Sequence, residues 1–98
     1  MPKARTLLDL RHATFQPVEE LRWTGDHALM VAAIDWLTKS GIPVSRSSAI
    51  QLKIGSLSFY PGTGTINFDN QRRLSEIGLE GLKAVLERAT GRVLPAVD

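Results

Sequence analysis

The chain contains no cysteine and only two histidines, His12 and His27. The absence of cysteine excludes disulfides, thiolate zinc sites and cysteine nucleophiles. The two histidines do not combine with carboxylates at a recognisable metal-ligand spacing, so we expect neither a metal nor a cofactor. Asp26 and His27 could form an acid–base pair, but no serine nucleophile or third orienting group accompanies them. The sequence therefore favours a protein without catalytic residues.

The chain also lacks long apolar runs and a strong net charge. No window approaches the roughly 18 apolar residues of a membrane span. Asp9 and Arg11 interrupt the first residues, which argues against a signal peptide, and we expect a cytoplasmic protein with no membrane contact. The net charge is +2, so the pI near 9.4 reflects only two surplus cations and is a weak indication of nucleic-acid binding.

The 98 residues suit a single domain. We expect a core over residues 24–91, an N-terminal segment of unassigned structure over residues 1–23, and a loose tail over residues 92–98. Within the first segment, Pro17 begins a short helical turn, and Leu7–Phe15 is compatible with an extra strand or a short helix.

The clearest pattern lies between Ala49 and Asp69, where apolar and polar residues alternate. The apolar members are Ile50, Leu52, Ile54, Leu57, Phe59, Ile66 and Phe68. Alternation with a period of two predicts antiparallel strands with one buried and one wetted face. Gly55-Ser56 predicts a tight turn or a bulge, and Pro61–Gly64 predicts a hairpin turn.

A helix is expected on each side of these strands. The first begins at Asp26, a good N-cap, and runs to about Ser40, with Gly41 as its stop. Its apolar stripe consists of Met30, Ala33, Ile34 and Leu37. The residues from Ile42 to Ser48 then form a connector, whose polar run Ser45-Arg46-Ser47-Ser48 is expected to be exposed.

The second helix follows Arg73 and runs to about Thr90, with Gly91 as its cap. Its apolar face consists of Leu74, Ile77, Leu82, Val85, Leu86 and Ala89. Gly78 and Gly81 disfavour a helix interior, which indicates close approach to the sheet or to the first helix. Trp23 and Trp36 are expected in the core or at a helix–sheet seam.

Together these elements predict an α+β fold, a two-layer sandwich. A small antiparallel sheet of about three strands, with one more from the N-terminal segment left open, is covered on one face by two helices.

The other sheet face is polar and carries Gln51, Lys53, Ser58, Tyr60, Thr65, Asn67 and Asp69. Such a face is commonly only wetted by solvent. It can also bind, because Tyr60 can stack on a base and Lys53 can contact a phosphate. Arg72 and Arg73 precede the second helix, whose free amides favour anions, and with Arg46 they could form a phosphate-binding cluster.

Two function classes are favoured over a third, a small hydrolase centred on His27. The first is a small non-enzymatic binding domain that contacts nucleic acid through Arg46, Lys53, Tyr60, Arg72 and Arg73. The alternative is a protein-interaction or inhibitor-type module, with a homodimer as one of its forms, that uses an exposed sheet edge or the first helix.

The order helix, three strands, helix over Asp26–Gly91 resembles the double-stranded-RNA-binding-domain architecture, including the small HicA-type toxins. The resemblance implies the αβββα fold. HicA-type proteins carry a catalytic histidine by the first strand, where this chain has Ser47-Ser48-Ala49-Ile50, so that activity is not implied. The lysine cluster that such RNA-binding domains place at the last helix has its nearest counterpart in Arg72-Arg73.

Overall fold

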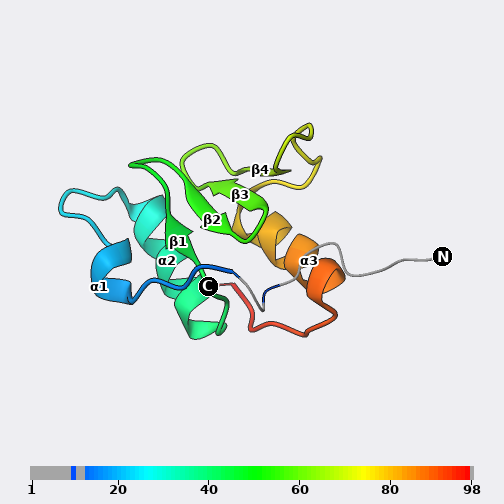
Figure 1. Cartoon of the computed structure of the whole chain (residues 1–98), viewed down its shortest axis with the longest axis horizontal. Coiled ribbons are helices and arrows are strands. Elements are labelled where there is room, and N and C mark those ends of the chain that lie inside the picture. The colour runs from blue at the N-terminus through cyan, green and yellow to red at the C-terminus, as the bar shows by residue number, and fades with distance from the viewer. Residues whose placement is uncertain (1–9, 11–12, 98) are drawn as a thin grey trace.

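The computed structural model describes the chain at Leu10 and over residues 13–97. Two long helices lie beside a small antiparallel sheet of four strands in the order β1-β2-β3-β4 (Figure 1). The helices are α1 (Val18–Leu21), α2 (Ala28–Lys39) and α3 (Gly78–Thr90), and the strands are β1 (Ser45–Arg46), β2 (Leu52–Ile54), β3 (Leu57–Tyr60) and β4 (Thr65–Phe68). The predicted α+β class is confirmed. Within the described residues, no helix combines the length and the apolar character needed to cross a membrane.

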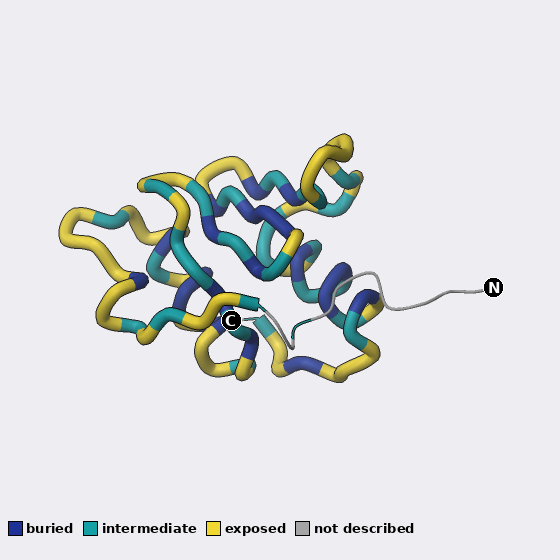
Figure 2. The backbone as a smooth tube through the Cα atoms, in the orientation of Figure 1, coloured by how far each residue is buried: buried dark blue, intermediate teal, exposed yellow. Residues whose placement is uncertain are grey.

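The sheet packs one face onto both long helices. Directly opposed residues share a face, and the register pairs Leu52 with Phe59 and Phe59 with Ile66. These residues form one buried cluster with the predicted α2 stripe and with the buried face of α3. The α3 members of the cluster are Leu82, Val85, Leu86 and Ala89. Figure 2 marks the buried positions in dark blue along the strands and the two long helices.

The turns between the three predicted strands are as expected. Ile54 pairs with Leu57, so Gly55 and Ser56 form a two-residue turn, in which Gly55 takes the positive φ that a hairpin needs. Ile50 was expected to continue the alternation of β2, but it lies outside the strand and is 63% exposed.

The fourth strand comes from the connector rather than from the N-terminal segment. Ser45 and Arg46 pair with Lys53 and Leu52, so this part of the connector is a half-buried strand and not the exposed run that was predicted. Gln16 covers the outer edge of this strand: its backbone N–H donates to the Val44 carbonyl at 3.1 Å, and its side-chain oxygen accepts from the Arg46 N–H at 2.6 Å. The prediction for Leu7–Phe15 falls largely outside the described residues.

Helix α2 begins one residue later than expected. The N-cap is His27, whose Nδ1 accepts a hydrogen bond from the Met30 N–H at 3.3 Å. Asp26 was predicted to be the cap, but its carboxylate is occupied by Arg46. The C-terminal stop is confirmed, because Gly41 has φ +72° and the Ile42 N–H donates to the Leu37 carbonyl, which is a Schellman motif.

Helix α3 begins at Gly78, five residues after Arg73. The intervening chain instead runs back along β4: Arg73 forms a bridge with Asn67, and the Leu74 N–H donates to the Ile66 carbonyl at 2.7 Å. This segment covers the second edge of the sheet. Because Leu74–Ile77 is not helical, Ile77 is 65% exposed rather than on the buried helix face.

The two glycines of α3 have local roles. Gly78 has φ +75°, a conformation that favours glycine. A Cβ on Gly81 would lie 3.0 Å from the backbone of Glu76. Gly81 therefore approaches the segment before the helix rather than the sheet or α2. Gly78 approaches the turn that leads into β4, since its N–H donates to the Gly64 carbonyl at 2.9 Å.

The C-terminal tail is docked rather than loose. Leu94 is only 6% exposed and belongs to the core cluster. Its backbone N–H donates to Glu87 at 2.8 Å, which lowers the pKa of the Glu87 carboxyl, and the Trp36 indole N–H donates to the Pro95 carbonyl at 3.1 Å. Trp36 is therefore at a seam, between α2 and the tail.

This docking predicts that Leu94→Ala lowers the free energy of unfolding by about 2–3 kcal/mol, because it removes a buried leucine side chain from the core. Urea denaturation followed by circular dichroism measures the change. The matched control is Val93→Ala, since Val93 is 94% exposed and its truncation should change the stability by less than about 0.5 kcal/mol. Equal stabilities of the two variants would contradict a docked tail.

Candidate nucleic-acid interface

The strand register builds a row of polar side chains across the open face of the sheet. Successive cross-strand partners make up this row, which runs through Ser45, Lys53, Ser58, Asn67 and Arg73. Because opposed residues share a face, all five lie on the side away from the helices. Three strand spacings separate Lys53 from Arg73, which is roughly 14 Å between their backbones. Two of the sequence-predicted site residues are thus brought onto one surface.

Tyr60 adds an aromatic ring to the same face. It follows Ser58 by two positions in β3 and pairs directly with Thr65 of β4, so its side chain lies beside the row. It is half-buried, which leaves part of the ring accessible. Thr65 shares a hydrogen bond of 2.8 Å with the Thr63 hydroxyl in the adjoining turn.

The centre of this face is closed by its own hydrogen bonds. Ser58 was expected to be wetted, but it is only 3% exposed, and its hydroxyl accepts a hydrogen bond of 2.9 Å from the Gln51 amide. Asn67 donates to the neighbouring Phe68 carbonyl at 3.0 Å. The charged groups of the face therefore lie toward its two sides.

Lys53 has a carboxylate partner, whereas Arg73 has none among the described residues. The Lys53 ammonium donates to the Asp69 carboxylate, and the Lys53 side chain is 24% exposed. Arg72 and Arg73 are exposed, and neither forms an ion pair with another described residue. The two arginines lie along the edge of β4 rather than directly before α3, where they were expected.

Arg46 does not join this surface, because its side chain is buried with only 1% exposed. Each of its five N–H donors has an acceptor. Nε donates to Ser48 O at 3.0 Å, Nη1 to Leu21 O and to Asp26 at 2.7 Å each, and Nη2 to Asp26 and to Ala49 O at 2.8 Å each. No donor is left for a phosphate, so the expected cluster of Arg46 with Arg72 and Arg73 does not form.

The surroundings of Arg46 explain the position of Trp23 and the lowered pKa of Asp26. The ring of Trp23 stacks on the guanidinium at 4.0 Å, so Trp23 lies over this site, 45% exposed, rather than in the core. Hydrogen bonds from Arg46 lower the pKa of Asp26 to about 2. Sequence reasoning missed this site, although Thr24-Gly25-Asp26 marked the turn that supplies the carboxylate.

Asp26 and His27 do not form an acid–base pair. The carboxylate of Asp26 is taken by Arg46, and Nδ1 of His27 accepts the helix-capping hydrogen bond. The His27 ring packs against Gly62 of the β3–β4 turn. Among the described residues, no three histidine or carboxylate side chains come together as metal ligands do.

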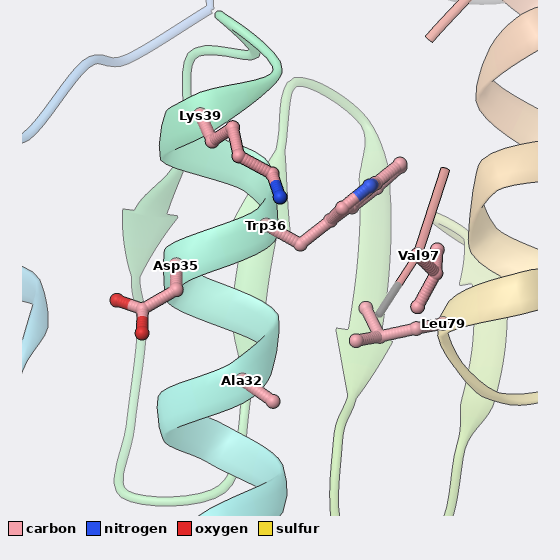
Figure 3. A pocket seen from close by; sticks show the side chains of 6 residues that line it. All are labelled: Ala32, Asp35, Trp36, Lys39, Leu79 and Val97. Carbon is pink, nitrogen blue, oxygen red and sulfur yellow. The ribbon is translucent and has the colours of Figure 1, made fainter. Parts of the chain in front are cut away.

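A second surface is the groove between α2 and α3, formed by two adjoining cavities. The larger, of about 340 Å³, is bordered by the exposed side chains of Leu29 and Ile77, which are 57% and 65% exposed. The smaller, of about 210 Å³, is lined by Ala32, Asp35, Trp36, Lys39, Leu79 and Val97. Figure 3 shows Trp36, Leu79 and Val97 converging there while Asp35 points away from them. The docked tail forms one wall, which the sequence did not predict.

We expect Arg46→Ala to lower the free energy of unfolding by about 3–5 kcal/mol, because it leaves the carboxylate of Asp26 buried without its partner. Arg46→Lys should also destabilise the protein, since an ammonium cannot reproduce the planar five-donor geometry. Urea denaturation of both variants is compared with Arg72→Ala, which removes an exposed arginine. If Arg46→Ala and Arg72→Ala unfold at the same urea concentration, the buried pair of Arg46 and Asp26 is not needed for stability.

The same pair predicts a loss of stability in acid. Because the pKa of Asp26 is about 2 in the folded protein and 3.8 ordinarily, the unfolded chain takes up the proton first as the pH falls. The stabilisation is complete above 3.8 and is lost as the pH approaches 2. The difference in unfolding free energy between the parent and Asp26→Asn should therefore shrink over this interval. A difference independent of pH would contradict the lowered pKa.

Comparisons with known proteins identify no relative of this chain. No protein-family model, curated protein or solved structure matches it. The similarity to double-stranded-RNA-binding domains and HicA-type proteins therefore stays a prediction based on element order.

Proposed function

We propose that the chain is a small binding domain that contacts single-stranded nucleic acid through the polar face of its sheet. The observation that carries the proposal is the register, which gathers Lys53, Tyr60 and Arg73 from separate segments onto one side of the sheet. Arg72, the neighbour of Arg73 in sequence, is a further exposed cation. The expected cytoplasmic location belongs to the same proposal.

The chemistry of the face suits an unpaired strand. A single strand needs cations that follow its phosphates and an aromatic ring on which a base can stack, and Tyr60 supplies that ring beside the row. A duplex hides its base faces, so Tyr60 would have no role in binding it. The polar groups at the centre of the face are already hydrogen-bonded, which favours binding without sequence preference.

The expected affinity is modest. Lys53, Arg72 and Arg73 can neutralise at most three phosphates once Arg46 is excluded. For single strands, log K falls by about 0.7 per neutralised phosphate for each unit of log salt, so the predicted slope is about −2.

The test is a fluorescence-anisotropy titration with a labelled oligothymidine of about twelve nucleotides, a length within the range of known single-strand sites. Lys53→Gln and Arg73→Gln should each weaken binding and reduce the salt slope by about 0.7. Tyr60→Ala should weaken binding about fivefold or more, because base–aromatic stacking is lost.

The matched control is Lys83→Gln. Lys83 has a carboxylate partner and an exposure close to those of Lys53, 26% against 24%, but it lies on α3, across the core from the polar face. Its removal should leave the titration unchanged. Binding that does not respond to salt, or no binding at low salt, would refute the proposal.

The α2–α3 groove favours a second candidate, a protein-interaction module. Leu29 and Ile77 expose apolar surface on either side of a cavity whose floor includes Phe59. A partner would have to use this groove rather than a sheet edge, because Gln16 and the Arg73–Leu74 segment cover the outer strands. Under this alternative, neither the parent nor Lys53→Gln binds the oligothymidine at low salt.

A further inference from the structure

The carboxylate of Asp69 lies on the proposed binding face itself. Asp69 follows Asn67 by two positions and so points to the same side of the sheet. Its backbone N–H donates to the Ser56 carbonyl at 2.8 Å, which holds it beside the β2–β3 turn.

The ion pair with Asp69 draws Lys53 down onto the sheet. Lys53 is in β2 and Asp69 follows β4, so the lysine side chain must extend across β3 to reach the carboxylate. This path agrees with its low exposure of 24%, whereas the Asp69 side chain is 51% exposed. The carboxylate side chain is therefore more exposed to solvent than the lysine side chain.

We propose that Asp69 is an autoinhibitory carboxylate, which occupies Lys53 in place of a phosphate and limits the affinity of the face for nucleic acid. This inference rests on the proposed function. A phosphate that approaches Lys53 must displace the carboxylate, and it then remains close to a like charge. Both effects oppose binding, and neither requires a conformational change of the backbone.

The loss of affinity caused by these two effects together can be estimated from the energetics of exposed charges. Breaking an exposed ion pair and holding two negative charges several ångströms apart in water each reduce affinity by a few-fold. We therefore expect Asp69→Asn to tighten binding of the oligothymidine by about five- to tenfold. Lys53 contacts a phosphate in the complex of either protein, so the salt slope should stay at about −2 and the gain should appear as tighter binding at a given salt concentration.

The matched control is Asp35→Asn, which makes the same change in net charge. Asp35 is a similarly exposed carboxylate, at 58%, and its cationic neighbour, Arg22, lies 4.0 Å away. It belongs to α2, beneath the opposite face of the sheet, so its neutralisation should alter binding by less than twofold or so. Melting temperatures of both variants establish that they are folded.

A double variant, Lys53→Gln/Asp69→Asn, separates release of the lysine from simple loss of repulsion. The gain from Asp69→Asn should fall to about half or less in the Lys53→Gln background, measured as a ratio of dissociation constants. An undiminished gain would show that Asp69 acts by repulsion alone and would overturn its role as a clamp on Lys53.

The outcomes distinguish this inference from the proposed function. If the parent binds and Asp69→Asn behaves like Asp35→Asn, the autoinhibitory role is wrong and the nucleic-acid function stands. If only Asp69→Asn binds at low salt, the proposed function of the parent chain is refuted, whereas the blocking of Lys53 by Asp69 is supported. If neither binds at low salt, both are overturned.

Discussion

The buried guanidinium of Arg46 is the constraint on which one side of the fold depends. Burying a charge is costly unless it is paired and fully hydrogen-bonded, and here a carboxylate and three backbone carbonyls satisfy all five donors. Those acceptors come from the end of α1, from the turn before α2 and from the β1–β2 connection. One side chain thus determines how three segments meet. It also diverts Asp26 from capping α2, which leaves that role to His27.

The rest of the structure covers the apolar face and both edges of the sheet and leaves its polar face uncovered. The helices and the docked tail cover the apolar face, Gln16 protects the edge of β1, and the Arg73–Leu74 segment protects the edge of β4. Covered edges prevent pairing with other chains. The polar face and the α2–α3 groove remain as the surfaces available to a partner, which is why both enter the functional argument.

The distribution of the cations matters more than their number. Arg46 is committed to the fold, and Lys53 is held by Asp69 on the surface proposed to bind. On α3, Lys83 and Arg88 are paired with carboxylates as well. A pI near 9.4 therefore overstates the positive charge that a phosphate chain would meet. In the proposed binding mode, the exposed Arg72 and Arg73 are the cations that no described carboxylate occupies.

The sequence by itself determined the three-stranded meander, the buried stripe of α2 and the glycine stops at Gly41 and Gly91, because periodicity and turn chemistry act between near neighbours. Only the tertiary structure decided the fate of Arg46 and Leu94. Arg46 looked like a surface cation among serines until the chain brought Asp26, 20 residues away, against it. Leu94 was expected in a loose tail, but in the fold its side chain is buried in the core. Burial of a single side chain depends on partners distant in sequence, and no local pattern records them.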